Sequence, residues 1–282
     1  MTITIKPDNA ALLKDLELFV VATQENLQHL DREPFGIELK EKNIFDPLRM
    51  SSHGFLELLK RLDEVTFGPE GMPMPRWVFF AGSELPAGII GFGRSIEKLR
   101  DAGRKLFGVP ESYRGLVPYS MFIAIPMSDE DTWMGHNLAS VASLLPDENL
   151  SGLGSLTKAV ALRVYRTKWQ VGATQWDTHA LAVHTRLGPL ELITAWTPAH
   201  GEPWTLTYRA TINDDTLKNL ARDPAGKVVR PKPDFTIDSA DHEAMKALQI
   251  RIETGERFCI ADRPESLGPH RNRVPIAKLS SR

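Results

Sequence analysis

The spacing of hydrophobic residues predicts a succession of short helices and strands. Near the N-terminus, a broad apolar face predicts a helix over residues 10–30, with Asp8 as its N-cap. A second amphipathic pattern predicts a helix over 53–65. Alternating segments at 76–81 and 87–94 then predict two strands joined as an antiparallel hairpin.

The remainder of the chain continues in the same way. Residues 204–212 alternate strongly and are expected to pair antiparallel with the strand that precedes them. This order predicts an α/β (α+β) fold with a mixed, mostly antiparallel central sheet flanked by helices. The predicted helices span 96–107, 156–169, 178–187 and 240–252, and the predicted strands span 119–127, 138–145, 173–176, 190–196, 204–212 and 257–261.

Composition fits an ordinary globular chain of 282 residues, of which 42% are hydrophobic and 25% charged. We expect a main domain over 1–212 and a C-terminal appendage over 213–282 packed on it. The net charge of −2 argues against a dedicated nucleic-acid binder. Cys259 is the single cysteine, so no intramolecular disulfide can form. No signal-peptide pattern or membrane-spanning run is found, so we expect a cytoplasmic protein without membrane partners.

One stretch carries a chemical signal: the apolar run 138–145, a glycine-containing loop over 149–155, and the helical pattern that follows. The first N–H groups of a helix have no acceptor inside it, and the helix dipole adds positive charge there. Gly152 and Gly154 let the backbone approach a ligand closely. The pattern predicts a phosphate or pyrophosphate site.

Two motifs in this region resemble the GNAT superfamily of acyl-CoA-dependent N-acyltransferases. The first matches the family's pyrophosphate loop, Arg/Gln-x-x-Gly-x-Gly/Ala, except at its first position. The run from Asp177 to Pro189 follows the family's later signature in phase. The resemblance covers 76–212, excluding a long insertion over 95–136, and the hairpin before it resembles the family's paired upstream strands. The loop motif reads Asn149-Leu150-Ser151-Gly152-Leu153-Gly154.

The resemblance implies an acyl-CoA cofactor, with acetyl-CoA the first choice, whose pantetheine lies along 138–145 like an added strand. Asn149 departs from the family's longer donor, so Lys158 or a tail arginine is expected to replace one contact. The residues expected to bind the cofactor are Leu144, Leu145, Asn149, Leu150, Ser151, Gly152, Leu153, Gly154, Ser155 and Asp177.

The implied reaction moves the acyl group to an amine of a small-molecule or carrier-bound acceptor. A lysine-type amine must first lose a proton, at a cost of about 4.6 kcal/mol at pH 7, so a base is needed. His184 takes the place of the family's tyrosine and is the candidate acid. The candidates for the base are His136, Glu148, Asp129 and Glu130.

Two other functions stay open. A GNAT-like decarboxylase would need no amine, and His184 with Thr178 or Thr185 would stabilise an enolate. A non-catalytic acyl-CoA sensor or partner-binding domain would explain why both motifs have lost a polar residue. The sequence indicates neither the acceptor nor the oligomeric state.

Overall fold

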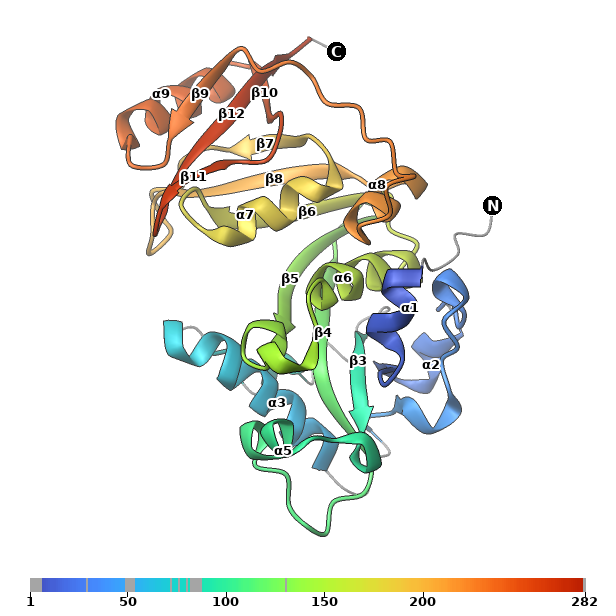
Figure 1. Cartoon of the computed structure of the whole chain (residues 1–282). Coiled ribbons are helices and arrows are strands. Elements are labelled where there is room, and N and C mark those ends of the chain that lie inside the picture. The colour runs from blue at the N-terminus through green and yellow to red at the C-terminus, as the bar shows by residue number, and fades with distance from the viewer. Residues whose placement is uncertain are drawn as a thin grey trace. The chain divides into compact units, whose positions relative to one another are not determined.

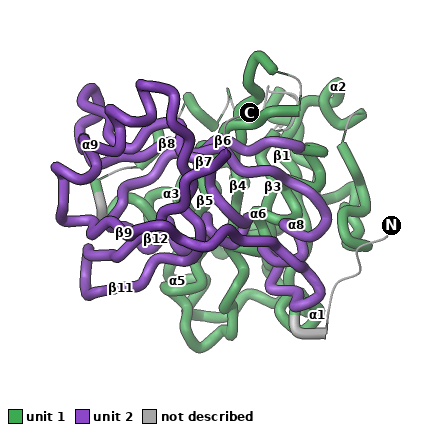
Figure 2. The backbone as a smooth tube through the Cα atoms, turned by 90° about the horizontal axis from the view of Figure 1, so that it is seen from above, with its two compact units in different colours: residues 1–167 green, residues 168–282 purple. Residues whose placement is uncertain are grey.

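The chain forms two compact units, residues 1–167 and 168–282 (Figure 2). The computed structural model describes residues 7–28, 30–48, 54–71, 73–75, 77–79, 81, 88–129 and 131–280. Each unit contributes a set of neighbouring strands. The predicted boundary at 212/213 falls within the second unit, between a strand and a helix.

The strands of unit 1 are ordered β5-β4-β3-β1-β2. All neighbouring strands are antiparallel except the short β1–β2 pair. Strands β3, β4 and β5 lie side by side (Figure 1). Its helices are α1 (Pro7–Leu13), α2 (Gln24–Leu27), α3 (Gly54–Phe67), α5 (Asp101–Phe107) and α6 (Leu153–Val164), and its strands are β1 (Glu17–Val21), β2 (Ile44–Phe45), β3 (Ile89–Ser95), β4 (Leu116–Pro126) and β5 (Thr132–Ser140).

Strand β4 is the centre of this unit. Nine consecutive residues from Leu116 to Ala124 are buried, so both faces of the strand are covered. Helices α3 and α6 both pack on β4. Strand β3 passes close beside it, since a Cβ at Gly91 would lie 2.0 Å from the Ser120 carbonyl oxygen. Glycine is therefore required there.

The strands of unit 2 are ordered β11-β12-β10-β7-β8-β6, all paired antiparallel, and β9 also pairs with β12. Strand β10, from beyond the predicted domain boundary, pairs directly with β7. The helices are α7 (His179–His184), α8 (Asp214–Leu220) and α9 (His242–Glu253), and the strands are β6 (Trp169–Gln175), β7 (Leu190–Thr194), β8 (Thr205–Thr211), β9 (Phe235–Asp238), β10 (Arg257–Ile260), β11 (Glu265–Gly268) and β12 (Arg271–Leu279).

The predicted fold class is confirmed at the level of a mixed α/β chain with mostly antiparallel pairing. The predicted helix over 53–65 appears as α3, and its apolar face is buried as expected. The strand over 204–212 appears as β8 and pairs antiparallel with β7.

The helix predicted over 10–30 is wrong. Helix α1 ends at Leu13, and β1 then pairs with β3 and β2. Four consecutive residues, Leu18 to Val21, are almost fully buried. A continuous apolar run of this kind suits a strand covered on both faces as well as a buried helix, and periodicity alone does not separate the two.

The predicted upstream hairpin is also wrong. Residues 77–79 and 81 are helical, and Trp77 is 68% exposed. Strand β3 instead pairs with β1 and β4. The supposed insertion over 95–136 supplies β4 and the first part of β5, so it is part of the sheet itself. The predicted turn at 82–86 lies outside the described residues.

Candidate functional site

The predicted anion-binding segment joins β5 to α6, but its elements are shorter than expected. Strand β5 ends at Ser140, and two 3-10 turns, Val141–Ser143 and Pro146–Glu148, follow it. Helix α6 begins at Leu153, not at 156, and ends at Val164. Residues 141–145 are thus not extended, which contradicts the expected strand-like contact with a pantetheine chain along them.

The first turn of α6 has the features of an anion site. Its N-cap is Gly152, at φ +94, which makes no side-chain capping bond. The Leu153 N–H donates to the Leu150 carbonyl (3.0 Å), and the Leu156 N–H donates to the Gly152 carbonyl (3.0 Å). Between these two bonds lie amides for which the helix itself provides no acceptor. This 12-residue helix therefore has no carboxylate or hydroxyl at its N-cap position, which is the end where the helix dipole favours negative charge.

Burial divides the predicted cofactor-binding residues into two groups. Leu145, Leu150, Leu153 and Ser155 are buried and anchor the loop to the core. Asn149, Ser151 and Leu144 are exposed, and Asn149 adopts a left-handed conformation (φ +55) that asparagine tolerates well. A diphosphate at this loop would meet backbone amides and the polar side chains of Asn149 and Ser151.

Glu148 does not lie in an open site. Its carboxylate forms a buried ion pair with Arg94 of β3, and the two side chains are 2% and 4% exposed. The Tyr119 hydroxyl of β4 donates to the same carboxylate (3.4 Å). The arrangement ties the residue just before Asn149 to two strands of the sheet. It fits an anchor for the loop better than a base. Arg94 was missed by sequence reasoning, although a lone arginine in an apolar strand signals a buried partner.

His136, on β5, lies beside a buried carboxylate. Asp63 of α3 is 1% exposed and accepts hydrogen bonds from the Asn137 side chain (2.9 Å) and the Met74 N–H (2.6 Å). Burial raises the pKa of Asp63. The His136 ring reaches solvent; partial desolvation lowers its pKa below the usual value, and Asp63 opposes that shift. The imidazole is therefore neutral at pH 7 and able to accept a proton.

Lys158, expected as a substitute phosphate ligand, is fully buried in α6. Its Nζ atom lies 5.8 Å from the centre of the Phe122 ring, and burial lowers its pKa to about 7. An ammonium group in that position cannot reach an anion at the exposed loop. Asp129 lies in the β4–β5 turn, and Glu130 lies outside the described residues.

The candidates for acid and enolate stabiliser belong to unit 2. His184 closes α7, and its ring lies 5.3 Å from that of Tyr208. The Thr178 and Thr185 hydroxyls donate to the carbonyls of Gln175 (3.1 Å) and Ala182 (3.0 Å). Because both hydroxyl protons are used locally, neither threonine is placed to donate to an enolate.

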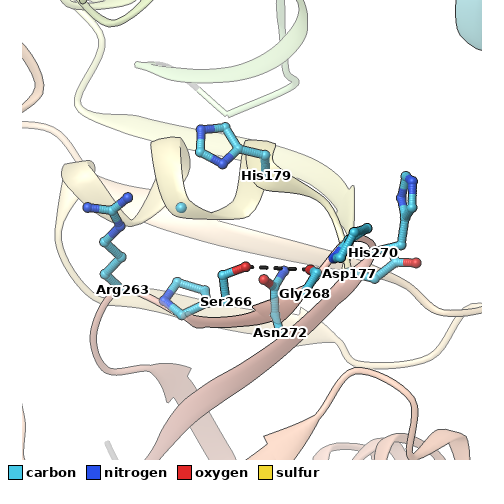
Figure 3. A pocket seen from close by; sticks show the side chains of 10 residues that line it. Asp177, His179, Arg263, Ser266, Gly268, His270 and Asn272 are labelled. Carbon is cyan, nitrogen blue, oxygen red and sulfur yellow. Dashed lines mark hydrogen bonds between the residues drawn. The ribbon is translucent and has the colours of Figure 1, made fainter.

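Asp177 lies at the edge of a pocket of about 530 Å³ in unit 2 (Figure 3). Thr178, not Asp177, is the N-cap of α7. The pocket lies between the start of α7 and the β11–β12 hairpin. Sequence reasoning missed this site because its two walls are over 80 positions apart and share no motif. The polar lining residues are Asp177, His179, Arg263, Ser266, His270 and Asn272.

No family model matches the chain, and no curated protein sequence matches it significantly. Within the described ranges, no helix is long and apolar enough to cross a membrane. The same residues contain no group of three or more His, Cys, Asp or Glu side chains arranged to hold a metal ion.

Proposed function

We propose that this chain is an acyl-CoA-dependent acyltransferase that acylates an amine, with the 149–155 loop binding the diphosphate. The uncapped first turn of α6 behind Gly152 is the observation that carries the proposal. A multiply charged anion would be favoured there, because it could accept hydrogen bonds from the helix N-terminus and interact with the positive end of the dipole. The GNAT resemblance supplies the identity of the anion's carrier.

In this proposal, several residues of unit 1 have a defined role in binding or proton transfer. When bound, acyl-CoA supplies an activated thioester carbonyl. Asn149, Ser151 and the first-turn amides of α6 hold its diphosphate. Glu148, locked to Arg94, fixes the loop at its start. His136 accepts the proton that the attacking amine must lose, because its lowered pKa keeps the ring neutral at pH 7.

Calorimetry of the full chain with coenzyme A tests the binding step. Ser151 is exposed and immediately precedes the N-cap, so Ser151→Asp places a carboxylate at the positive end of α6. The new charge should stabilise the helix by about 0.3–1 kcal/mol while repelling the diphosphate. We expect an unchanged or higher Tm and at least about a tenfold loss of affinity. Ser151→Asn, which lacks the charge, is the matched control.

Thiol release tests the reaction. Cys259 is 1% exposed, so Ellman's reagent reports free coenzyme A with little background from the folded protein. Acetyl-CoA should yield thiol only when an amine is added, and His136→Ala should reduce the rate by about a hundredfold. Carbon dioxide from malonyl-CoA without an acceptor would favour the decarboxylase instead. Absence of any coenzyme A binding would contradict the proposal altogether.

A further inference from the structure

The pocket of unit 2 has walls that are held firmly together. Asn272 of β12 is 8% exposed, and its side-chain amide donates to the carbonyls of Trp176 (3.0 Å) and Thr178 (3.2 Å). These bonds tie the β11–β12 hairpin to the turn between β6 and α7. The pocket between them is thus preformed, with a volume in the range of small-molecule sites.

Two opposite charges line this pocket without pairing. Among the described residues, neither the Arg263 guanidinium nor the Asp177 carboxylate makes an ion pair or a side-chain hydrogen bond. Two neighbouring arginines of the same hairpin do find carboxylates: Arg273 pairs with Glu265 (2.9 Å) and Arg271 with Asp238 (2.7 Å). Arg263 and Asp177 therefore differ from the paired surface charges around them.

The two charges occupy different ends of the pocket (Figure 3). In this view Arg263 lies at the left and Asp177 at the right, with His179 of α7 between them. Burial lowers the pKa of Arg186, and the like charges of Arg222 and Arg263 add to that shift, so positive charge gathers near the Arg263 end. Asp177 keeps the other end acidic. A ligand that carries only a negative charge would be repelled by Asp177. A ligand that carries only a positive charge would be repelled by Arg263.

We propose that this pocket binds a small amphoteric molecule, with an acid group held by Arg263 and His179 and a protonated amine held by Asp177. Guanidinium binds carboxylate and phosphate groups through paired, charge-assisted hydrogen bonds, and a carboxylate accepts readily from ammonium. Ser266 and Asn272 line the space between the ends. Such a ligand also carries an amine of the kind that the proposed transferase acylates; that role rests on the proposed function, whereas binding does not.

Calorimetry of the full chain without any acyl-CoA tests the proposal. The probes are γ-aminobutyrate, which carries a carboxylate, and O-phosphoethanolamine, which carries a phosphate. Butyrate, butylamine and inorganic phosphate are the controls with one charged group only. We expect at least one amphoteric probe to bind about tenfold more tightly than its single-charge controls. Comparison of the two amphoteric probes shows whether the pocket prefers a carboxylate or a phosphate.

Two variants locate the binding. Arg263→Gln and Asp177→Asn each remove one charge from a partly or fully exposed side chain, so both should fold normally. Each should weaken the preferred probe about tenfold. The control Arg273→Gln breaks a surface pair outside the pocket and should leave affinity within about twofold. Equal affinity for amphoteric and single-charge probes, or no effect of the two pocket variants, would overturn the proposal. Because no coenzyme A is present, these outcomes are independent of the transferase test.

Discussion

Lys158 shows how one buried side chain can set the pH response of the protein. It is fully buried in α6, and its pKa is lowered from 10.5 to about 7. Between pH 7 and pH 10.5, Lys158 therefore holds a proton in the unfolded chain but not in the folded chain. Stability contributed by this residue therefore rises with pH above 7, by at most about 1.4 kcal/mol per pH unit.

The variant Lys158→Met tests this account, since methionine fills a similar space without a charge. We expect the variant to be more stable than the wild type at pH 7, with the difference narrowing as the pH rises toward 9. Urea unfolding at several pH values measures it, and the other titrating groups cancel in the comparison. A difference that stays constant with pH would mean that Lys158 keeps its proton in the fold.

At the scale of elements, the two glycines of the loop have different tasks. Gly152 sits at φ +94, so Gly152→Ala should cost about 1 kcal/mol and weaken coenzyme A binding by displacing the loop. Gly154 is inside α6, and its added Cβ would meet Ser140 at an ordinary 3.4 Å. Gly154→Ala should therefore gain up to about 1 kcal/mol and retain affinity.

Thermal unfolding and calorimetry of the two variants provide the comparison. Equal destabilisation by both substitutions would show that the helix begins later than Leu153. Loss of affinity in Gly154→Ala with intact stability would instead show that the ligand lies against β5.

The sequence predicted elements well where polar and apolar residues alternate clearly, as in α3 and β8. It failed where polar and apolar residues do not alternate, or where a proline interrupts the alternation. Strand β1 is apolar throughout and looked helical, whereas β12 alternates but contains Pro275, which argues against a strand. The structure accommodates that proline because its carbonyl still accepts from the Ala261 N–H (2.9 Å).

The glycine turn before α6 was predictable because its residues are contiguous in the sequence. The Glu148–Arg94 pair and the Asp177–Arg263 pocket were not, since each joins residues that only the tertiary fold brings together. The prediction of Glu148 as a base could not take this ion pair into account. Its position near the loop was visible in the sequence, but its buried arginine partner was not.

At the scale of the whole molecule, each unit has its own core. Phe19, Phe92 and Tyr119 are fully buried in unit 1, as are Trp176, Tyr208 and Phe258 in unit 2. We therefore expect the two units to lose structure separately. Glu148→Gln leaves the buried Arg94 without its charge partner and should destabilise unit 1 by about 3–5 kcal/mol.

Cys259 provides an independent readout for unit 2, because burial leaves it 1% exposed and raises the pKa of its thiol to about 11. Glu148→Gln should speed hydrogen exchange in β3 and β4 without changing the rate of Cys259 labelling. Glu191→Gln is the reciprocal variant, since Glu191 pairs with Arg209 (2.9 Å) and Arg257 (2.8 Å) beside β10. It should speed Cys259 labelling and leave exchange in β4 unchanged. If either substitution accelerates both signals equally, the chain unfolds as one cooperative body, and the two cores depend on each other.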